Sequence, residues 1–135
     1  MRAIALDYGA ARTGVAVSDA TGTLARPVGV VERAASPAGL DRVTELVAEY
    51  GVEVVVVGLP LTLRGERGPQ AIETEAFIAR LRSRCRIPIL TEDERLTTSI
   101  ARRMPSSSRR RSSTTGDDAQ AAAVLLQTYL DRRAG

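Results

Sequence analysis

The sequence contains no histidine, no lysine and no tryptophan, and these absences exclude several kinds of chemistry. Without histidine the chain cannot form a His-based zinc site, a Ser-His-Asp triad or an imidazole acid–base catalyst. With one Phe and three Tyr, we do not expect bases to stack on a platform of aromatic side chains. Any catalysis must therefore depend on carboxylates, arginines, hydroxyls and bound metal.

Cysteine is also scarce, and the single Cys85 excludes an intrachain disulfide. The sequence shows no signal peptide and no apolar stretch of membrane-spanning length, so we expect a cytoplasmic protein. Its 135 residues, 44% of them hydrophobic, predict one domain at 1–135. The core of that domain must be aliphatic because aromatic side chains are so few.

All 19 basic residues are arginine, which gives a net charge of +3 and a pI near 9.7. GC-rich codon use is enough to explain the missing lysine, but the physical consequence is the same. Guanidinium groups bind phosphate through two hydrogen bonds and stay charged at any physiological pH. The charge balance therefore favours an anionic partner.

Hydrophobic and β-branched patterns predict a mixed α/β fold. Short connections between the first three strands predict an antiparallel meander, and the later strand–helix alternation adds two parallel strands. The result is a mixed five-stranded sheet with helices on its faces. The predicted elements are strands at 2–8, 13–18 and 28–31, a helix at 36–50, a strand at 52–57, a helix at 69–84, a strand at 87–90, a short helix at 96–104 and a last helix at 117–133.

Two of the predicted helices have informative details. Ser36 and Pro37 are typical of a helix start, and Gly51 is typical of a helix end. In the helix at 69–84 the apolar positions that fall roughly on one side are Ile72, Ala76, Ala79 and Leu81, which predicts that this side is buried.

Three acidic residues are placed where they can reach into a cleft. Asp7 ends an apolar run, Glu94 follows the apolar strand at 87–90, and Asp118 opens the last helix. Carboxylates at strand ends and helix starts are typical of ligand sites in α/β folds. If the three converge, they form an all-oxygen site for Mg²⁺ or Mn²⁺. Such a site beside a cationic surface favours phosphodiester chemistry on nucleic acid.

Each acidic position also has an ordinary structural explanation. Asp7 can begin a turn, and an Asp-x-Gly turn also binds phosphate in actin-like ATPases. The acidic run 92–94 can mark a helix N-terminus, where the helix dipole favours negative charge. The acidic pair 117–118 before an alanine-rich run is an ordinary helix start.

Arginines in several segments are candidates for binding phosphate. The Gly/Pro-rich segment 58–68 leaves the centre of the sheet, where open α/β sheets bind ligands, although it can equally be a solvated loop. The Ser/Arg-rich segment 105–116 is predicted to be a mobile loop that closes over nucleic acid, or else a simple solvated charge run. The candidate nucleic-acid-binding residues are Arg12, Arg64, Arg67, Arg95, Arg109, Arg110 and Arg111.

Four stretches, taken together and in order, resemble one known family. They are residues 5–19, residues 56–61 with Gly65 downstream, residues 93–98 and residues 118–131. The chain resembles the YqgF/RuvX family, the Holliday-junction-resolvase-like proteins also called pre-16S rRNA nucleases. Because the four motifs span nearly the whole chain in family order, the resemblance is far more specific than any single motif.

The resemblance implies an RNase H-like fold and a role in trimming the 5′ end of precursor 16S rRNA during ribosome maturation. It also implies that Asp7, Glu94 and Asp118 are the acidic residues that bind metal. The segment 105–116 departs from the family pattern, which leaves Asp117 as a rival to Asp118. Counting back from residues 125–127 favours Asp118.

These inferences combine into the hypothesis of a metal-dependent endonuclease. Asp7 would bridge two Mg²⁺ ions roughly 4 Å apart, and Glu94 and Asp118 would each complete the shell of one ion. Arginines would hold the flanking phosphates.

Three alternatives stay open. One is a Holliday-junction-type DNA resolvase, and a second is a non-catalytic module that binds RNA or ribosomal precursor particles with the same fold. The third is an actin-like ATPase, although that fold needs two domains of this kind and the chain supplies one. Both a monomer and a homodimer remain compatible with the sequence, since a resolvase needs a symmetric pair and an rRNA nuclease does not.

Overall fold

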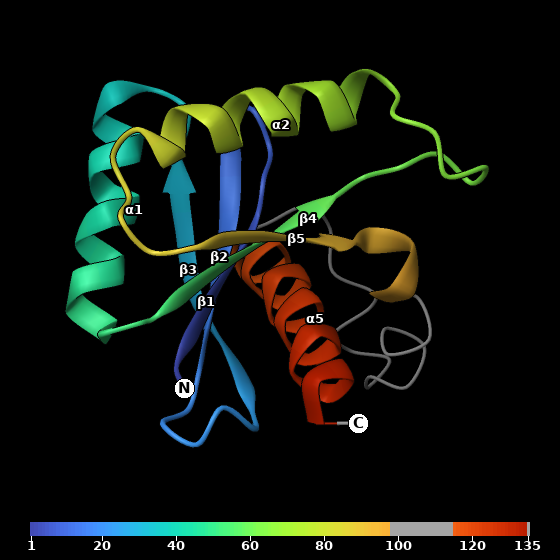
Figure 1. Ribbon diagram of the computed structural model, residues 1–135. Helices are drawn as coiled ribbons and strands as arrows, with labels where there is room; N and C mark the ends of the chain where they lie inside the picture. Colours follow the sequence, from blue (N-terminus) through green and yellow to red (C-terminus); the bar gives the residue numbers. More distant parts are fainter. Residues whose placement is uncertain (98–114, 135) are drawn as a thin grey trace.

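A computed structural model describes residues 1–97 and 115–134, which form a five-stranded sheet with helices packed on it (Figure 1). The elements in chain order are β1 (Ala3–Asp7), β2 (Arg12–Ser18), β3 (Ala25–Glu32), α1 (Pro37–Tyr50), β4 (Val54–Leu59), α2 (Pro69–Arg82), β5 (Ile89–Asp93), the 3₁₀ helix η1 (Glu94–Thr97) and α5 (Thr115–Ala134). Most of the predicted helix at 96–104 and of the predicted loop at 105–116 lies outside the described residues.

The strands lie in the order β3-β2-β1-β4-β5, so β1 is central. β1 pairs antiparallel with β2, and β2 pairs antiparallel with β3. On the other side β1 pairs parallel with β4, and β4 pairs parallel with β5. This confirms the predicted mixed sheet, a three-strand meander extended by two parallel strands. Asp7, at the end of β1, therefore lies in the middle of the sheet.

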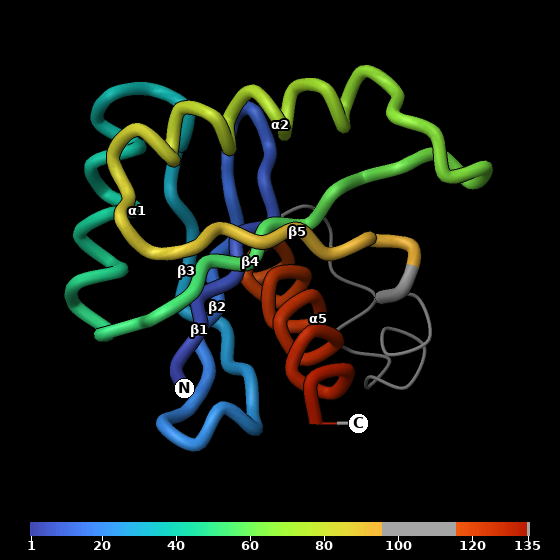
Figure 2. Tube along the Cα trace, in the orientation of Figure 1, coloured from blue at the N-terminus to red at the C-terminus, as the bar shows by residue number. Residues whose placement is uncertain are grey.

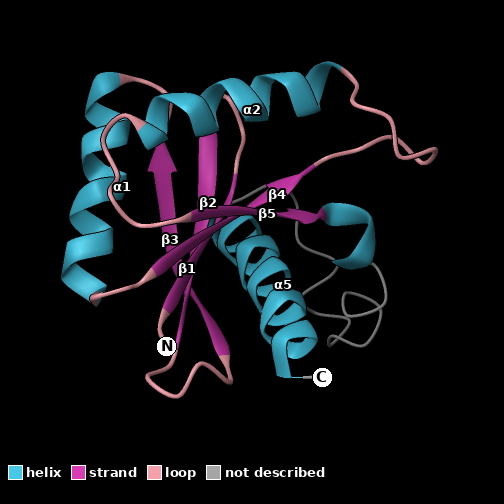
Figure 3. Ribbon diagram, in the orientation of Figure 1, coloured by secondary structure: helices cyan, strands magenta, loops and turns pink. Residues whose placement is uncertain are grey.

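Side chains of the central strands alternate between two hydrophobic cores, one on each face of the sheet. Ile4 and Leu6 of β1 pack with α1 and α2, whereas Ala3 and Ala5 pack with α5. Figure 3 shows these helices on opposite sides of the strands. The face under α5 is lined by small residues, and this lets α5 approach the sheet closely.

The predicted boundaries of α1 are confirmed. Ser36 caps the helix by accepting a hydrogen bond of 3.1 Å from the Gly39 amide, and Pro37 takes the first helical position. Gly51 ends the helix with a φ of 61°, a left-handed conformation that glycine adopts without strain. No helix in the described ranges is long and apolar enough to cross a membrane.

The predicted buried side of α2 is wrong. Ile72 is 56% exposed, and Ala76 and Ala79 are also exposed; of the four predicted residues only Leu81 is buried. The buried side instead contains Thr74, whose hydroxyl donates to the Gln70 carbonyl within the helix. That hydrogen bond satisfies the hydroxyl, so Thr74 is buried without cost. The buried side of α2 consists of Ala71, Thr74, Phe77, Ile78 and Leu81.

The last strand also differs from its prediction, because β5 runs to Asp93 rather than ending at Leu90. Its acidic residues are tolerated for a specific reason. Glu92 is only 5% exposed, but it accepts a hydrogen bond of 2.7 Å from Arg132 of α5. The extension places Glu94 at the start of η1, directly beyond the sheet.

Candidate active site

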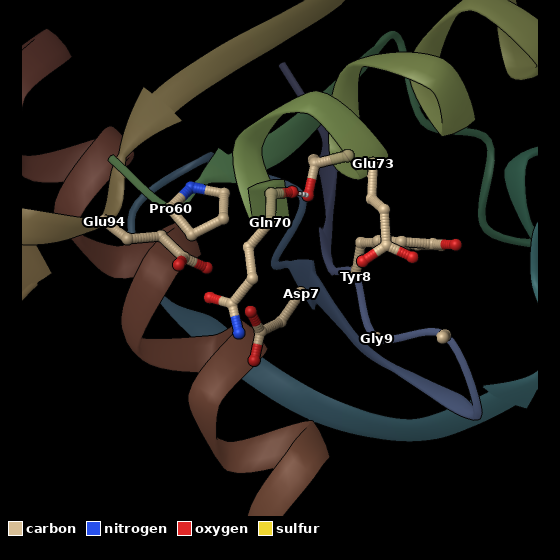
Figure 4. A pocket seen from close by; sticks show the side chains of 9 residues that line it. Asp7, Tyr8, Gly9, Pro60, Gln70, Glu73 and Glu94 are labelled. Carbon is tan, nitrogen blue, oxygen red and sulfur yellow. Dashed lines mark hydrogen bonds between the residues drawn. The ribbon is translucent and has the colours of Figure 1, made fainter. Parts of the chain in front are cut away.

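Asp7 and Glu94 line one pocket of about 290 Å³ at the end of the central strands (Figure 4). Asp7 is the last residue of β1, whose neighbours in the sheet are β2 and β4. The adjacent Tyr8 stacks on Phe77 of α2 with a centroid distance of 4.5 Å, which holds the end of β1 against that helix. The end of β1 that carries Asp7 is thus held by the sheet and by the stacking of the half-buried Tyr8 on the buried Phe77.

Glu94 reaches the pocket because β4 carries a glycine beside it. A Cβ atom at Gly58 would lie 2.6 Å from Glu94 Oε1 and 2.9 Å from its Cγ, closer than a side chain tolerates. The absence of a side chain at Gly58 therefore makes the space that Glu94 occupies.

The two carboxyl groups share a hydrogen bond and perturb each other's ionisation. Burial raises the pKa of Glu94 to about 8, and the hydrogen bond and the negative charge of Asp7 act in the same direction. Burial also raises the pKa of Asp7; the hydrogen bond from Glu94 opposes this rise and the charge of Asp118 adds to it. At neutral pH Glu94 is therefore the protonated partner that donates to the Asp7 carboxylate.

Asp118 lies in the first turn of α5, the helix that packs on the face of the sheet toward which Asp7 points. A Cβ atom at Gly14 of β2 would lie 1.8 Å from the Asp118 carbonyl oxygen, so glycine is required for this approach. Arg12 Nε lies 3.0 Å from Asp118 Oδ2. Of the pair 117–118, Asp118 is the residue whose charge acts on the pKa of Asp7.

The structure thus brings Asp7 and Glu94 together, while Asp118 pairs with Arg12 beside them. Within residues 1–97 and 115–134, no three acidic, histidine or cysteine side chains are grouped closely enough to hold a metal ion. The donor set nevertheless fits a hard cation, because all three residues offer carboxylate oxygens and two of them have pKa values raised by crowding and burial. A divalent cation would relieve that crowding.

Gln70 and Glu73 also line the pocket, and the sequence reasoning missed both. They come from the first turns of α2, and Figure 4 shows the Gln70 side chain extending toward Asp7 and Glu73 lying on the Tyr8 side. The signal that could have found them is their spacing of three residues, which places both on one side of a helix that begins beside the strand ends. Because the sequence analysis placed the wrong side of α2 against the sheet, it did not identify Gln70 and Glu73 as pocket residues.

The candidate phosphate-binding arginines are placed differently from one another. Arg12 contacts Asp118, and Arg67 pairs with Glu75 of α2. Arg95 donates to Asp93 from Nε at 3.0 Å and lowers the pKa of that carboxyl, so its guanidinium already has an acidic partner. Arg64 is exposed. Arg109, Arg110 and Arg111 lie outside the described residues.

Comparison with known proteins identifies the family. The family model described as "RuvX: Holliday junction resolvase" matches residues 1–132. The chain belongs to this RuvX family. The match covers all four motifs and the three acidic residues Asp7, Glu94 and Asp118.

Among the relatives, a protein of Desulforudis audaxviator is 48% identical over 99 residues, which cover 73% of this chain and 70% of the relative. A protein of Chloroflexus aurantiacus is 41% identical over 132 residues, which cover 96% and 86%. Both carry the name "Putative pre-16S rRNA nuclease". Relatives of this RuvX chain are thus named as enzymes that cleave phosphodiester bonds.

Solved structures confirm the RNase H-like, resolvase-type fold. RuvC of T. thermophilus, in complex with a Holliday junction substrate, has a TM-score of 0.66 at 18% identity, covering 100% of this chain and 96% of that chain. The resolvase of Fowlpox virus, in complex with Holliday junction DNA, has a TM-score of 0.58 at 12% identity and covers 100% of both chains. At these identities the likeness concerns the fold.

Proposed function

We propose that this RuvX chain is a metal-dependent endonuclease that trims the 5′ end of precursor 16S rRNA. The observation that carries the proposal is the hydrogen-bonded pair of Asp7 and Glu94 in a pocket at the end of the central strands. Family membership and the names of the relatives support nuclease activity. The relatives' names also supply the RNA substrate.

Asp7, Glu94 and Asp118 are the residues that would hold Mg²⁺ or Mn²⁺, and the bound metal would supply Lewis-acid stabilisation of charge at the phosphate. Glu94 must lose its proton to act as a ligand, and a cation near Asp7 lowers the cost of that loss. Arg12 forms an ion pair with Asp118 and so places a cation beside the proposed site. The exposed Arg64 and Arg67 lie in the segment that follows the pocket residue Pro60 and can contact flanking phosphates.

Cleavage of precursor 16S rRNA in Mg²⁺ tests the proposal. We expect the wild type to release the 5′ extension and Asp7→Ala to reduce the rate by at least about a thousandfold, because the central carboxylate is lost. Glu53→Gln is the matched control, since Glu53 is exposed and lies before β4, away from the pocket lining. Equal rates for wild type and Asp7→Ala would contradict the proposal.

A second candidate is a Holliday-junction resolvase, and the description of the family model favours it. Such an enzyme needs a symmetric homodimer to cut two strands of a junction. We would therefore assay a four-way DNA junction beside the rRNA and measure the oligomeric state in the same buffer. Paired cuts by a dimer, with intact rRNA, would favour the resolvase. Binding of either substrate without any cleavage would favour a non-catalytic RNA- or ribosome-binding module.

A further inference from the structure

The segment between β4 and α2 extends away from the rest of the molecule (Figure 2). Leu63 lies in this segment and is 95% exposed, the largest exposed fraction among the large hydrophobic side chains of the described residues. An isolated exposed leucine is common on protein surfaces. Leu63 differs from such a residue because it lies at the corner of a hydrogen-bonded turn, next to the exposed Arg64.

Leu63 and Arg64 occupy the two corner positions of a hydrogen-bonded turn. The Gly65 amide donates to the Thr62 carbonyl at 2.8 Å, and the Thr62 amide donates to the Glu66 carbonyl at 2.9 Å. The Glu66 amide also donates to Thr62 Oγ1 at 3.0 Å. Gly65 has a φ of 83°, a left-handed conformation that allows this closure. The turn therefore holds an apolar and a cationic side chain outward together.

The same turn is tied to the candidate active site. Arg95 Nη1 donates to the Leu63 carbonyl at 3.4 Å, and Arg95 is held by Asp93. The pocket residue Glu94 lies between Asp93 and Arg95 in the sequence, so the Asp93–Arg95 ion pair connects the turn to the segment that carries Glu94. Pro60 lines the pocket and precedes Leu63 by three residues, a chain length of at most about 11 Å. Three stacked bases at 3.4 Å cover roughly the same distance.

We propose that Leu63 is a wedge that inserts between stacked bases at the end or branch of a nucleic-acid helix, while Arg64 contacts the adjacent phosphate. This inference rests on the proposed nuclease function and specifies its substrate as RNA in which a helix ends near the cleaved bond. Apolar wedges with neighbouring cationic side chains are an established way of opening a base step. The chain has no tryptophan and one phenylalanine, so an aliphatic side chain takes this position.

Fluorescence of 2-aminopurine, placed at the last base pair of an RNA hairpin with a single-stranded extension, tests the wedge without turnover. All proteins carry Asp7→Asn so that the RNA stays whole. We expect binding to raise the fluorescence about threefold or more with Leu63 present, and Leu63→Ala to remove most of that rise. Leu63→Met should retain it, because methionine keeps the apolar volume. Leu24→Ala is the matched control, since Leu24 is also exposed, at 63%, but lies in the β2–β3 connection.

Cleavage rates of proteins that keep the native Asp7 give the second readout. Leu63→Ala should lower the rate of cleavage of the helix-ended RNA by about tenfold, because the leucine side chain is buried between bases only when that RNA is bound. The rate of cleavage of a single strand should fall by less than about twofold. No RNA binding, no fluorescence rise, or a rise unchanged in Leu63→Ala would overturn the wedge. So would a defect seen only with ribosomal precursor particles, which would assign Leu63 to a protein contact. A fluorescence rise without cleavage would support the wedge and contradict the nuclease.

Discussion

At the residue scale, the hydrogen-bonded carboxyl pair has a direct consequence for stability. Burial raises the pKa of Glu94 to about 8, whereas an unfolded chain leaves glutamate near its ordinary value of about 4.3. Between these two values the folded state binds a proton that the unfolded state has released. The protonation of Glu94 therefore contributes fully to the free energy of unfolding below the unfolded pKa. That contribution is lost as the pH rises through the folded pKa of about 8.

We predict that in EDTA the melting temperature falls between pH 5 and pH 8.5, and that Glu94→Gln flattens this fall. Glutamine keeps the shape and the hydrogen-bond donor but cannot ionise. Thermal melts across the pH range, with Glu53→Gln as the control that keeps the wild-type slope, measure the effect. A slope that is the same in Glu94→Gln and wild type would show that Glu94 does not titrate there.

Replacement of the central carboxylate gives a second prediction at this scale. Asp7→Asn should abolish cleavage and leave the melting temperature in EDTA unchanged or slightly higher, because it removes a buried charge without changing shape. A thermal melt and a cleavage assay on the same preparation check both parts. A large loss of melting temperature would identify Asp7 as a residue that the fold requires.

At the scale of elements, the position of α5 depends on one glycine in β2. A Cβ atom at Gly14 would lie 1.8 Å from the Asp118 carbonyl oxygen and 2.4 Å from its carbon, and these backbone atoms cannot rotate aside. Gly14→Ala must therefore displace either the helix or the strand. The cost should be at least about 2 kcal/mol.

We predict that Gly14→Ala lowers the melting temperature by about 8 °C and also impairs cleavage, since Asp118 moves with the helix. Gly68→Ala is the matched control, because a Cβ atom there would meet only Thr62 Cγ2 at an ordinary 3.4 Å. It should cost less than half as much. A melting temperature for Gly14→Ala equal to that of the control would show that α5 adapts freely.

The sequence predicts the elements better than it predicts their faces. The mixed sheet, the caps of α1 and the place of Asp7 at a strand end follow from local patterns, because strand ends and helix starts are marked by residue type. Gln70 and Glu73 were missed because α2 has apolar residues on more than one side, and the prediction chose the side of Ile72 rather than the buried side of Phe77 and Ile78. The partners of Arg12 and Arg95 depend on contacts between distant segments or on side-chain geometry, which a pattern of residue types does not contain.

At the scale of the whole molecule, the proposed metal site links three separate elements, β1, η1 and α5. A ligand that binds only the folded state stabilises it by about 2.7 kcal/mol at a concentration one hundred times its dissociation constant. Mg²⁺ should therefore raise the melting temperature of the whole chain. It should also reduce the pH dependence, because binding requires Glu94 to be ionised.

Thermal melts with and without Mg²⁺ at pH 7.5 measure this linkage. The rise should be several degrees in wild type and absent in Asp7→Asn, while Glu53→Gln should respond as the wild type does. An equal rise in all three proteins would indicate that the cation acts elsewhere on the surface.

The contact between Gly14 and Asp118 joins segments that leave the ribosome at different times. β1 and β2 are synthesised first, but Asp118 follows them by about a hundred residues, which takes roughly 5 to 20 s at ordinary rates of synthesis. Until then Asp7 lacks Asp118, and the alanine-lined face of the sheet lacks the helix that covers it. The proposed metal site therefore stays incomplete until the segment that carries Asp118 has been synthesised and has folded onto the sheet.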